Sequence, residues 1–287
     1  MHRLGYGARA NQRMTANSKT KIFLDSGDPA ETREVLSILG FLDGQTTNPS
    51  LIAKNPETAG KKFSTKELLD FYRKVVEEVS SLIPQGSVSI EVYADASTSA
   101  DAMFAQGREF FKWIPNAHIK YPTTTVGLKA AERSVAEGMR VNMTLCFSQE
   151  QAAAVYAATT GSKKGQVFVS PFVGRIDDRG ENGMDLIKNI LAMYEQGDHH
   201  VEVLTASVRS IEHIIKAINL GSNILTAPIK ILKEWKDRGM PNQMSNLKSI
   251  PYKNIALDKS RQEYNIQHEL TDIGIQKFSD DWNRLIA

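Results

Sequence analysis

The stretch HIKYPTTTVGLKAAERSVAEGMRVNMTLCF, residues 118–147, sets a short apolar run, a helical pattern and a second apolar run in succession. The two runs are His118–Pro122 and Arg140–Phe147. The pattern between them, Val126–Glu137, is followed by Gly138, a residue that commonly ends helices. A strand, a helix and a strand in this order are typical of a βαβ unit with parallel strands. The stretch therefore predicts an α/β fold.

The same alternation covers most of the chain. Further strand-like runs are Lys21–Ser26, Leu42–Thr47, Val88–Tyr93, Val167–Val173, His200–Val208 and Asn223–Ile229. Further helical patterns are Ala30–Leu39, Lys66–Leu82, Ser99–Lys112, Gln149–Thr159, Met184–Tyr194 and Ile211–Leu220. Eight strand-and-helix units in about 220 residues favour a (β/α)8 TIM barrel. A doubly wound open sheet is the alternative, but no Gly-rich dinucleotide loop follows the first run.

The composition narrows the function classes. Of 287 residues, 41% are apolar and 24% are charged, as in a globular protein with a full core. No apolar stretch approaches the roughly 20 residues that span a bilayer, so we expect no membrane association. The net charge is +2 and the basic residues are scattered, which argues against a nucleic-acid surface. The single cysteine, Cys146, excludes an internal disulfide and fits a cytoplasmic location.

The two ends of the chain differ from the middle. Residues 1–20 contain three arginines, one lysine and no acid, and we expect a disordered extension there; a transit peptide or a true start near Met14 are the alternatives. Residues 21–287 are expected to form one barrel domain. Its C-terminal extension, about 239–287, contains the polar stretch Gly239–Glu263 and a last helix, Asp272–Leu285.

Strand parity gives a first view of the interior. Side chains on a strand alternate between its two faces, and five runs carry polar side chains on one face. These sets are Ser89 and Glu91; His118 and Lys120; Asn142, Thr144 and Cys146; Ser170 and Phe172; and Thr205, Ser207 and Arg209. Because barrel active sites form at the C-terminal ends of the strands, we expect these side chains to converge there.

Lys120 is the leading candidate for catalysis. It lies in an apolar run, and burial disfavours the charged form of a lysine. A neutral amine can attack a ketone and form a Schiff base. The simpler interpretation is a lysine whose stem leads its amine back to solvent.

Other candidates have simpler interpretations as well. Asp25 is either a general acid/base or a helix cap, whereas Glu91, on the inward face of an apolar strand, needs a partner. Thr46 and Asn48 lie in a segment, Thr46–Ser50, that suits a turn or can present a hydroxyl and an amide to a polyol.

Two arginines follow the sixth and seventh runs. Arg175 and Arg209, beside Ser170 and Ser207, suggest a phosphate cradle, and either arginine alone could form a surface ion pair. Metal binding is not predicted, because the adjacent His199 and His200 would point apart on a strand. Cys146 is interpreted as a small core residue.

From about Lys21 to Arg238 the chain resembles the transaldolase family, in the small subfamily that includes the fructose-6-phosphate aldolases, within the class I aldolases. The motifs that carry the resemblance are Phe23-Leu24-Asp25, Thr46-Thr47-Asn48-Pro49-Ser50-Leu51, Val88-Ser89-Ile90-Glu91-Val92, Ile119-Lys120-Tyr121-Pro122, Asn142-Met143-Thr144-Leu145, Ser170-Pro171-Phe172-Val173-Gly174-Arg175 and Ala206-Ser207-Val208-Arg209.

The resemblance implies a Schiff base on Lys120 and no metal or other cofactor. It implies that Glu91 and Thr144 handle a water and that Asp25 takes the proton that lets a carbon–carbon bond break. Further, it implies that Thr46, Asn48 and Ser170 hold a dihydroxyacetone unit, and that Arg175, Ser207 and Arg209 hold the phosphate. The substrates would be fructose 6-phosphate or sedoheptulose 7-phosphate and an aldose phosphate of the pentose phosphate pathway, and the protein would be a homo-oligomer.

Phe172 bears on the branch of the family. The aldolase relatives carry a tyrosine there, whose hydroxyl can orient a water that protonates the enamine and releases free dihydroxyacetone. Phenylalanine cannot do this, so the resemblance implies transfer, with lyase activity as the alternative. A sugar-phosphate-binding protein without turnover and a metal-dependent aldolase are alternatives from other classes.

Overall fold

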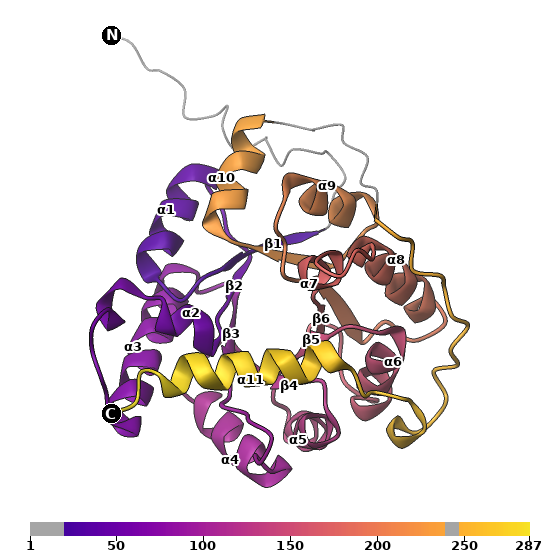
Figure 1. The fold of residues 1–287 in the computed structure, drawn as a ribbon, viewed down its shortest axis with the longest axis horizontal. Helices are drawn as coiled ribbons and strands as arrows, with labels where there is room; N and C mark the ends of the chain where they lie inside the picture. The colour runs from indigo at the N-terminus through magenta and orange to yellow at the C-terminus, as the bar shows by residue number, and fades with distance from the viewer. Residues whose placement is uncertain (1–19, 239–246) are drawn as a thin grey trace.

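The computed structural model describes residues 20–238 and 247–287, and within them eight parallel strands close into a barrel in the order β1 to β8. The strands are β1 (Lys21–Asp25), β2 (Gly44–Thr46), β3 (Ser87–Glu91), β4 (Ala117–Pro122), β5 (Val141–Cys146), β6 (Val167–Pro171), β7 (Val201–Thr205) and β8 (Ile224–Ala227). The barrel closes where β1 pairs with β8. Figure 1 looks down this barrel, with the helices arranged around it. The predicted (β/α)8 fold is confirmed, and the open sheet is excluded.

Helices connect the strands on the outside. They are α1 (Pro29–Leu39), α2 (Pro49–Ala53), α3 (Thr65–Leu82), α4 (Ala100–Phe110), α5 (Thr125–Ala136), α6 (Gln149–Ala158), α7 (Val173–Asp177), α8 (Gly183–Tyr194), α9 (Ile211–Asn219), α10 (Ile229–Arg238) and α11 (Glu269–Asn283), with short 3-10 helices η1 (Pro56–Thr58) and η2 (Arg261–Glu263). The sequence did not predict α2, α7 or α10. The first two have five residues each, too few to show a helical period, and α10 begins where the eighth strand was expected to end.

Local signals explain where the first helix begins and ends. The Asp28 side chain accepts a hydrogen bond from the Ala30 N–H, and Pro29 occupies the first turn, where its missing N–H costs nothing. Gly40 ends the helix with a φ of 78°, a conformation that glycine adopts without steric cost. The polar sequence around Asp28 therefore sets the direction in which the chain leaves β1.

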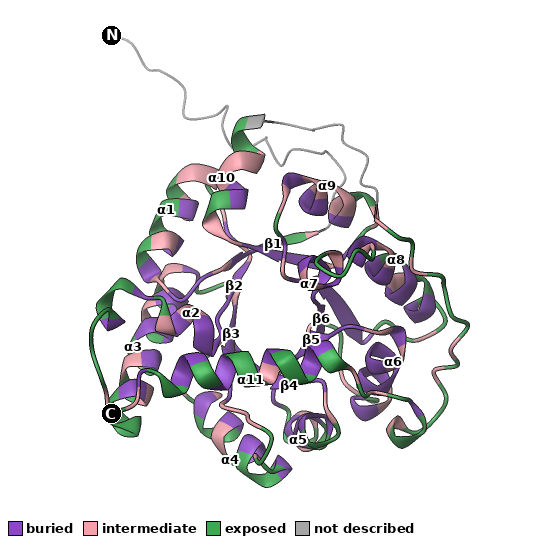
Figure 2. Ribbon diagram, viewed as in Figure 1, coloured by how far each residue is buried: buried purple, intermediate pink, exposed green. Residues whose placement is uncertain are grey.

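The C-terminal helix α11 lies across the mouth of the barrel. In Figure 1 it crosses in front of β4 and β5, and it contacts α2 and β5. Its apolar side chains Leu270, Phe278 and Trp282 are buried, and Figure 2 shows the helix buried on one side and exposed on the other. The hydroxyl of Ser50 on α2 also donates to the carboxylate of Asp281. The predicted C-terminal helix is present and covers the end of the barrel where the strands finish.

The polar stretch before α11 runs along the outside of the barrel. The Ile250 N–H donates to Asp185, and the Lys253 N–H donates to Gln149, so the segment follows α8 and α6. The part of this stretch from 239 to 246, and residues 1–19 of the expected N-terminal extension, lie outside the described residues. Within the described ranges, no helix is long and apolar enough to cross a membrane.

Candidate active site

The inner face of the barrel carries the polar residues expected of β3 to β5. Glu91, Lys120 and Asn142 are register partners on neighbouring strands, so their side chains leave the sheet on the same side. Contacts place that side inside: Asn142 Nδ2 donates to Ser89 Oγ at 3.1 Å, and Ser170 Oγ donates to Asn142 Oδ1 at 2.6 Å. A row of polar groups therefore links β3, β5 and β6 across the interior.

The prediction for β7 is wrong, because its inner face is the opposite one. Glu202 pairs in register with Phe168, and Phe168 stacks on His118 with ring centroids 4.0 Å apart inside the barrel. Glu202, and with it Leu204 and Ala206, therefore faces inward, while Thr205 contacts Ser222.

Ser207 and Arg209 nevertheless reach the site. Ser207 has a φ of 58°, which breaks the strand alternation, and Ser207 and Arg209 both line the cavity that contains Lys120. The predicted placement of these two residues is therefore correct, but it results from the irregular backbone at Ser207 and not from the strand alternation on which the prediction was based.

A similar irregularity corrects the placement of Cys146. The β5–β6 register shifts between Met143 and Cys146, and Leu145 has a φ of 58°. The alternation that places Thr144 inside therefore does not continue to Cys146. The Cys146 thiol contacts the Ser148 carbonyl, and its burial raises the pKa to about 12. Cys146 belongs to the packed layer outside the cavity, in agreement with the core interpretation.

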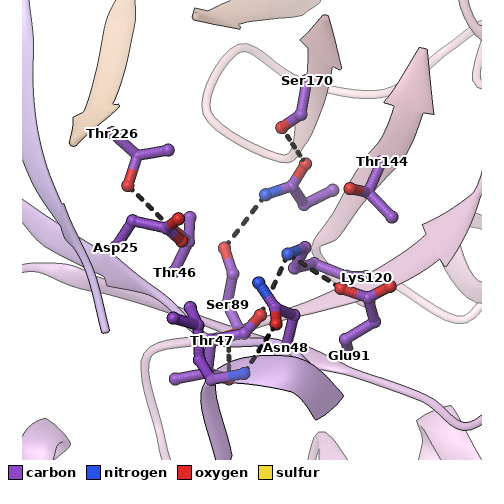
Figure 3. Close-up of polar contacts among 12 residues, drawn as sticks. Asp25, Thr46, Thr47, Asn48, Ser89, Glu91, Lys120, Thr144, Ser170 and Thr226 are labelled. Atoms are coloured by element: carbon purple, nitrogen blue, oxygen red, sulfur yellow. Dashed lines mark hydrogen bonds and ion pairs between the residues drawn. The ribbon is translucent and has the colours of Figure 1, made fainter. Parts of the chain in front are cut away.

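Lys120 is buried, with 3% of its surface exposed. Its Nζ donates to the Thr47 carbonyl at 2.9 Å and lies 2.9 Å from Glu91 Oε2. Figure 3 shows these contacts, with the side chain of Thr144 on the neighbouring strand pointing into the same space. The buried amine is thus fixed by two groups, from the C-terminal ends of β2 and β3.

The two carboxyl groups nearest Lys120 hold their protons more tightly than usual. Burial raises the pKa of Glu91, and the Lys120 charge opposes the shift. Burial likewise raises the pKa of Asp25, opposed by the Lys120 charge and by the Thr46 hydroxyl, which donates to Asp25 Oδ1 at 2.7 Å. Carboxyls with raised pKa values are suited to exchange protons near neutral pH.

Thr144 has a hydroxyl with no hydrogen-bond partner among the described residues, although it is fully buried. Buried polar groups in native proteins are usually paired with protein or with water. The Thr144 hydroxyl is therefore available for a water or a substrate oxygen beside Lys120.

Ten of the eleven predicted site residues line one cavity of about 470 Å³. They are Asp25, Thr46, Asn48, Lys120, Thr144, Ser170, Phe172, Arg175, Ser207 and Arg209. Glu91 lies behind Lys120 and lines a small adjacent space of about 10 Å³. The cavity is large enough for a sugar phosphate. It contains an amine that can react with a carbonyl group, on Lys120, and two guanidinium groups that can bind an anion, on Arg175 and Arg209.

The two arginines lie toward the mouth of this cavity. The Arg175 guanidinium lies over the Phe172 and Phe278 rings, 5.2 and 5.5 Å from their centroids, and its Nη1 has no hydrogen-bond partner within the described ranges. Arg209 donates to Asp178 at the surface. Stacking fixes the plane of the Arg175 guanidinium while leaving N–H groups free, a suitable arrangement for binding an oxyanion.

Gly174 allows α7, which carries Arg175, to lie close to the segment that carries Ser207 and Arg209. A Cβ at this position would lie 2.4 Å from the Ser207 carbonyl oxygen and 2.6 Å from Arg209 Nε.

We expect Gly174→Ala to displace Arg209, lower the free energy of unfolding by about 1–3 kcal/mol and raise the KM for phosphorylated substrates. Thermal melts and kinetics with phosphorylated and unphosphorylated sugars check this. Gly180→Ala adds a methyl group in open space at a φ of 80°, which strains an alanine, so this control should lower stability without changing the KM. An unchanged KM in Gly174→Ala would contradict the role.

Residue-by-residue reasoning missed several cavity residues. The Thr226 hydroxyl on β8 lies 2.7 Å from Thr46 Oγ1, which holds Asp25. Thr226 could have been found from the sequence, because it is a polar residue near the end of the apolar eighth run. Lys54 and Lys277 also line the cavity, but they lie directly after α2 and on α11, so no strand pattern could place them there. Among residues 20–238 and 247–287, no three His, Cys, Asp or Glu side chains cluster as metal ligands would.

Comparisons with known proteins place the chain in one family. The model of the family described as transaldolase/fructose-6-phosphate aldolase matches residues 22–287. A protein named probable transaldolase from Dehalococcoides mccartyi is 36% identical over 262 residues, covering 91% of this chain and 97% of its own. Proteins of the same name from a Roseiflexus species and from Sorangium cellulosum are 37% and 38% identical, covering 91% and 80% of this chain and 96% and 98% of their own.

Proposed function

This chain belongs to the transaldolase/fructose-6-phosphate aldolase family, and we propose that it is a transaldolase. It transfers a dihydroxyacetone unit from a ketose phosphate, fructose 6-phosphate or sedoheptulose 7-phosphate, to an aldose phosphate of the pentose phosphate pathway. The observation that carries the proposal is the buried Lys120 amine, 2.9 Å from Glu91 Oε2, in one cavity with Asp25 and two arginines. Cleaving and forming carbon–carbon bonds next to a ketone is the chemistry that such an amine supports.

The reaction begins at the keto carbon of the donor. Lys120 passes its ammonium proton to Glu91, 2.9 Å away, and the resulting amine adds to the keto carbon and forms a carbinolamine. Glu91, whose pKa is raised by burial, supplies a proton through a water held by the free Thr144 hydroxyl, and the carbinolamine hydroxyl leaves as water. The product is an iminium ion whose positive charge draws electrons from the neighbouring bond.

Cleavage follows at the bond beyond the iminium carbon. Asp25 takes the proton of the C4 hydroxyl, the C3–C4 electron pair moves into the iminium system, and an aldose phosphate leaves. The remaining enamine on Lys120 attacks the carbonyl carbon of an acceptor aldehyde, and Asp25 returns its proton to the new hydroxyl. Hydrolysis through the same water then frees Lys120.

Binding contacts divide between the two ends of the substrate. Thr46, Asn48 and Ser170 hold the hydroxyls of the dihydroxyacetone unit; Ser170 accepts from the substrate, since its own proton goes to Asn142. Arg175, Ser207 and Arg209 hold the phosphate. The support is their joint position around one cavity, with the free guanidinium N–H groups of Arg175 at its outer part.

Borohydride trapping tests the proposal. Borohydride with fructose 6-phosphate should add a reduced dihydroxyacetone unit to Lys120, located by peptide mass spectrometry. Trapping on Lys54 or Lys277, the other cavity lysines, or no trapping together with loss of activity in chelators, would overturn the Schiff-base assignment.

Phe172 sets the balance between transfer and release in this proposal. Its ring lies beside Phe147 and Arg175 and offers no hydroxyl to a water. We expect Phe172→Tyr to raise the release of free dihydroxyacetone roughly tenfold, at the expense of transfer. The estimate corresponds to one additional hydrogen bond that orients the protonating water. Coupled assays with and without acceptor aldehyde measure both; Phe172→Leu separates loss of the ring from gain of the hydroxyl. Unchanged partitioning would count against this role of Phe172.

The same proposal covers assembly and location. We place the enzyme in the cytoplasm as a homo-oligomer, and light scattering on the purified full-length chain tests the second part.

A further inference from the structure

The hydroxyl of Tyr72, on the outer helix α3, reaches the strand ends that hold Lys120. We propose that Tyr72 is a positioning residue for Lys120: it keeps the Thr47 carbonyl and the Glu91 carboxylate where both contact the lysine amine. The inference rests on the proposed Schiff-base function and adds a residue outside the cavity to it.

Tyr72 is held rigidly. It is 1% exposed, and its ring packs against Phe110, Trp113 and Trp282 with centroids 6.1, 6.0 and 5.9 Å away. Three aromatic neighbours on α4, on the segment after it and on α11 leave the ring no alternative direction. The hydroxyl position is therefore fixed by the packing of the helical layer.

The hydrogen bonds of this hydroxyl have a defined direction. The Glu91 N–H donates to Tyr72 Oη at 2.9 Å. Thr47 Oγ1 donates to the Ser89 carbonyl at 2.7 Å, so it accepts the Tyr72 proton in their 2.6 Å contact. The Tyr72 hydroxyl thus accepts from β3 and donates to the residue after β2, and all three groups are buried.

The bond to Glu91 replaces one that a regular ladder would make. In a parallel ladder, a residue that donates its N–H to one residue of the neighbouring strand accepts with its carbonyl from the residue two positions further along that strand. The Thr47 N–H donates to the Ser89 carbonyl at 3.0 Å, so a regular ladder would continue with the Glu91 N–H donating to the Thr47 carbonyl. Here the Glu91 N–H goes to Tyr72 instead. The Thr47 carbonyl is left to accept from Lys120 Nζ at 2.9 Å.

Removing the Tyr72 hydroxyl would leave the Glu91 N–H to compete with Lys120 for the Thr47 carbonyl. In Tyr72→Phe the Glu91 N–H is buried without an acceptor, and the nearest way to satisfy it is to close the ladder onto the Thr47 carbonyl. Closing the ladder takes that acceptor from Lys120 and shifts the backbone that carries the Glu91 carboxylate. Arg175, which is proposed to bind the phosphate, lies on α7, a separate element, and stays in place.

Tyr121→Phe is the matched control. Tyr121 is also fully buried, and its hydroxyl also pairs with a hydroxyl, Ser134 Oγ on α5, at 2.9 Å. It sits next to Lys120 on β4 but faces the helices, so its loss costs a similar hydrogen bond without touching the Lys120 contacts.

The experiment compares the two variants in the full chain with wild type. We expect Tyr72→Phe to lower kcat, and the rate of borohydride trapping at saturating fructose 6-phosphate, about tenfold, with KM within about twofold. Tyr121→Phe should show a similar drop in Tm with kcat near wild type. If Tyr72→Phe does not fold, Thr47→Val, which removes the acceptor of the Tyr72 proton, should show the same split between kcat and KM.

The outcomes separate the two proposals. Absence of wild-type trapping on Lys120 defeats the proposed function itself. Wild-type trapping combined with equal kcat in Tyr72→Phe and Tyr121→Phe overturns only the role of Tyr72, as does a loss confined to KM.

Discussion

Lys120→Met should abolish transfer and Schiff-base formation together while the protein still folds. Methionine has a similar length and fills the buried space, but it has no nucleophilic nitrogen. The Glu91 carboxyl, left without its 2.9 Å partner, takes up a proton because burial already raises its pKa. We expect kcat to fall by roughly 10⁴-fold or more, with no borohydride adduct.

Lys54→Met is the control for this result. Lys54 lines the same cavity directly after α2, and its charge acts on Asp25 but is not in contact with Glu91. Adduct formation should persist on Lys120 in this variant. An Lys120→Met protein that still forms an adduct would show that a different amine carries the chemistry.

Asp25→Asn should separate carbinolamine formation from carbon–carbon cleavage. The amide keeps the oxygen that accepts from Thr46 but cannot take the C4 hydroxyl proton. Lys120, Glu91 and Thr144 are untouched, so the Schiff base should still form. We expect transfer to fall about 10²–10⁴-fold while borohydride still traps the whole ketose phosphate on Lys120. A trapped adduct of the size of dihydroxyacetone alone would show that cleavage does not depend on Asp25.

The same variant should change how stability depends on pH. Since the folded pKa of Asp25 is raised, this carboxyl binds more protons in the folded than in the unfolded chain above about pH 4, and its contribution to stability falls as pH rises through the folded pKa. Asp25→Asn lacks this loss. The free energy of unfolding of Asp25→Asn, and with it the Tm, should therefore gain on wild type as the pH rises from about 4 toward neutrality. A constant difference across that range would mean that the Asp25 carboxyl is not perturbed.

Much of the site could be predicted because side chains along each barrel strand alternate between the inside and the outside of the barrel. Ser89, Glu91, Lys120, Asn142 and Thr144 face inward as their parity requires, since β3, β4 and the first part of β5 are regular. The error on β7 arose because parity assigns two faces without deciding which one is inside. The register of Glu202 with Phe168 decides this, and register is a property of two strands together.

The eight strand-and-helix units and the polar groups at the strand ends could be predicted from the residues alone, because both follow from the local alternation of side chains. Three other features arise only when the chain is folded. The tertiary structure places α11 over the mouth, it turns Ser207 with a φ of 58° toward the cavity, and it brings the Tyr72 hydroxyl from an outer helix to the strand ends beside Lys120. These depend on contacts between residues far apart in the chain, up to 231 positions for Ser50 and Asp281, and no local pattern specifies which distant partner will be met.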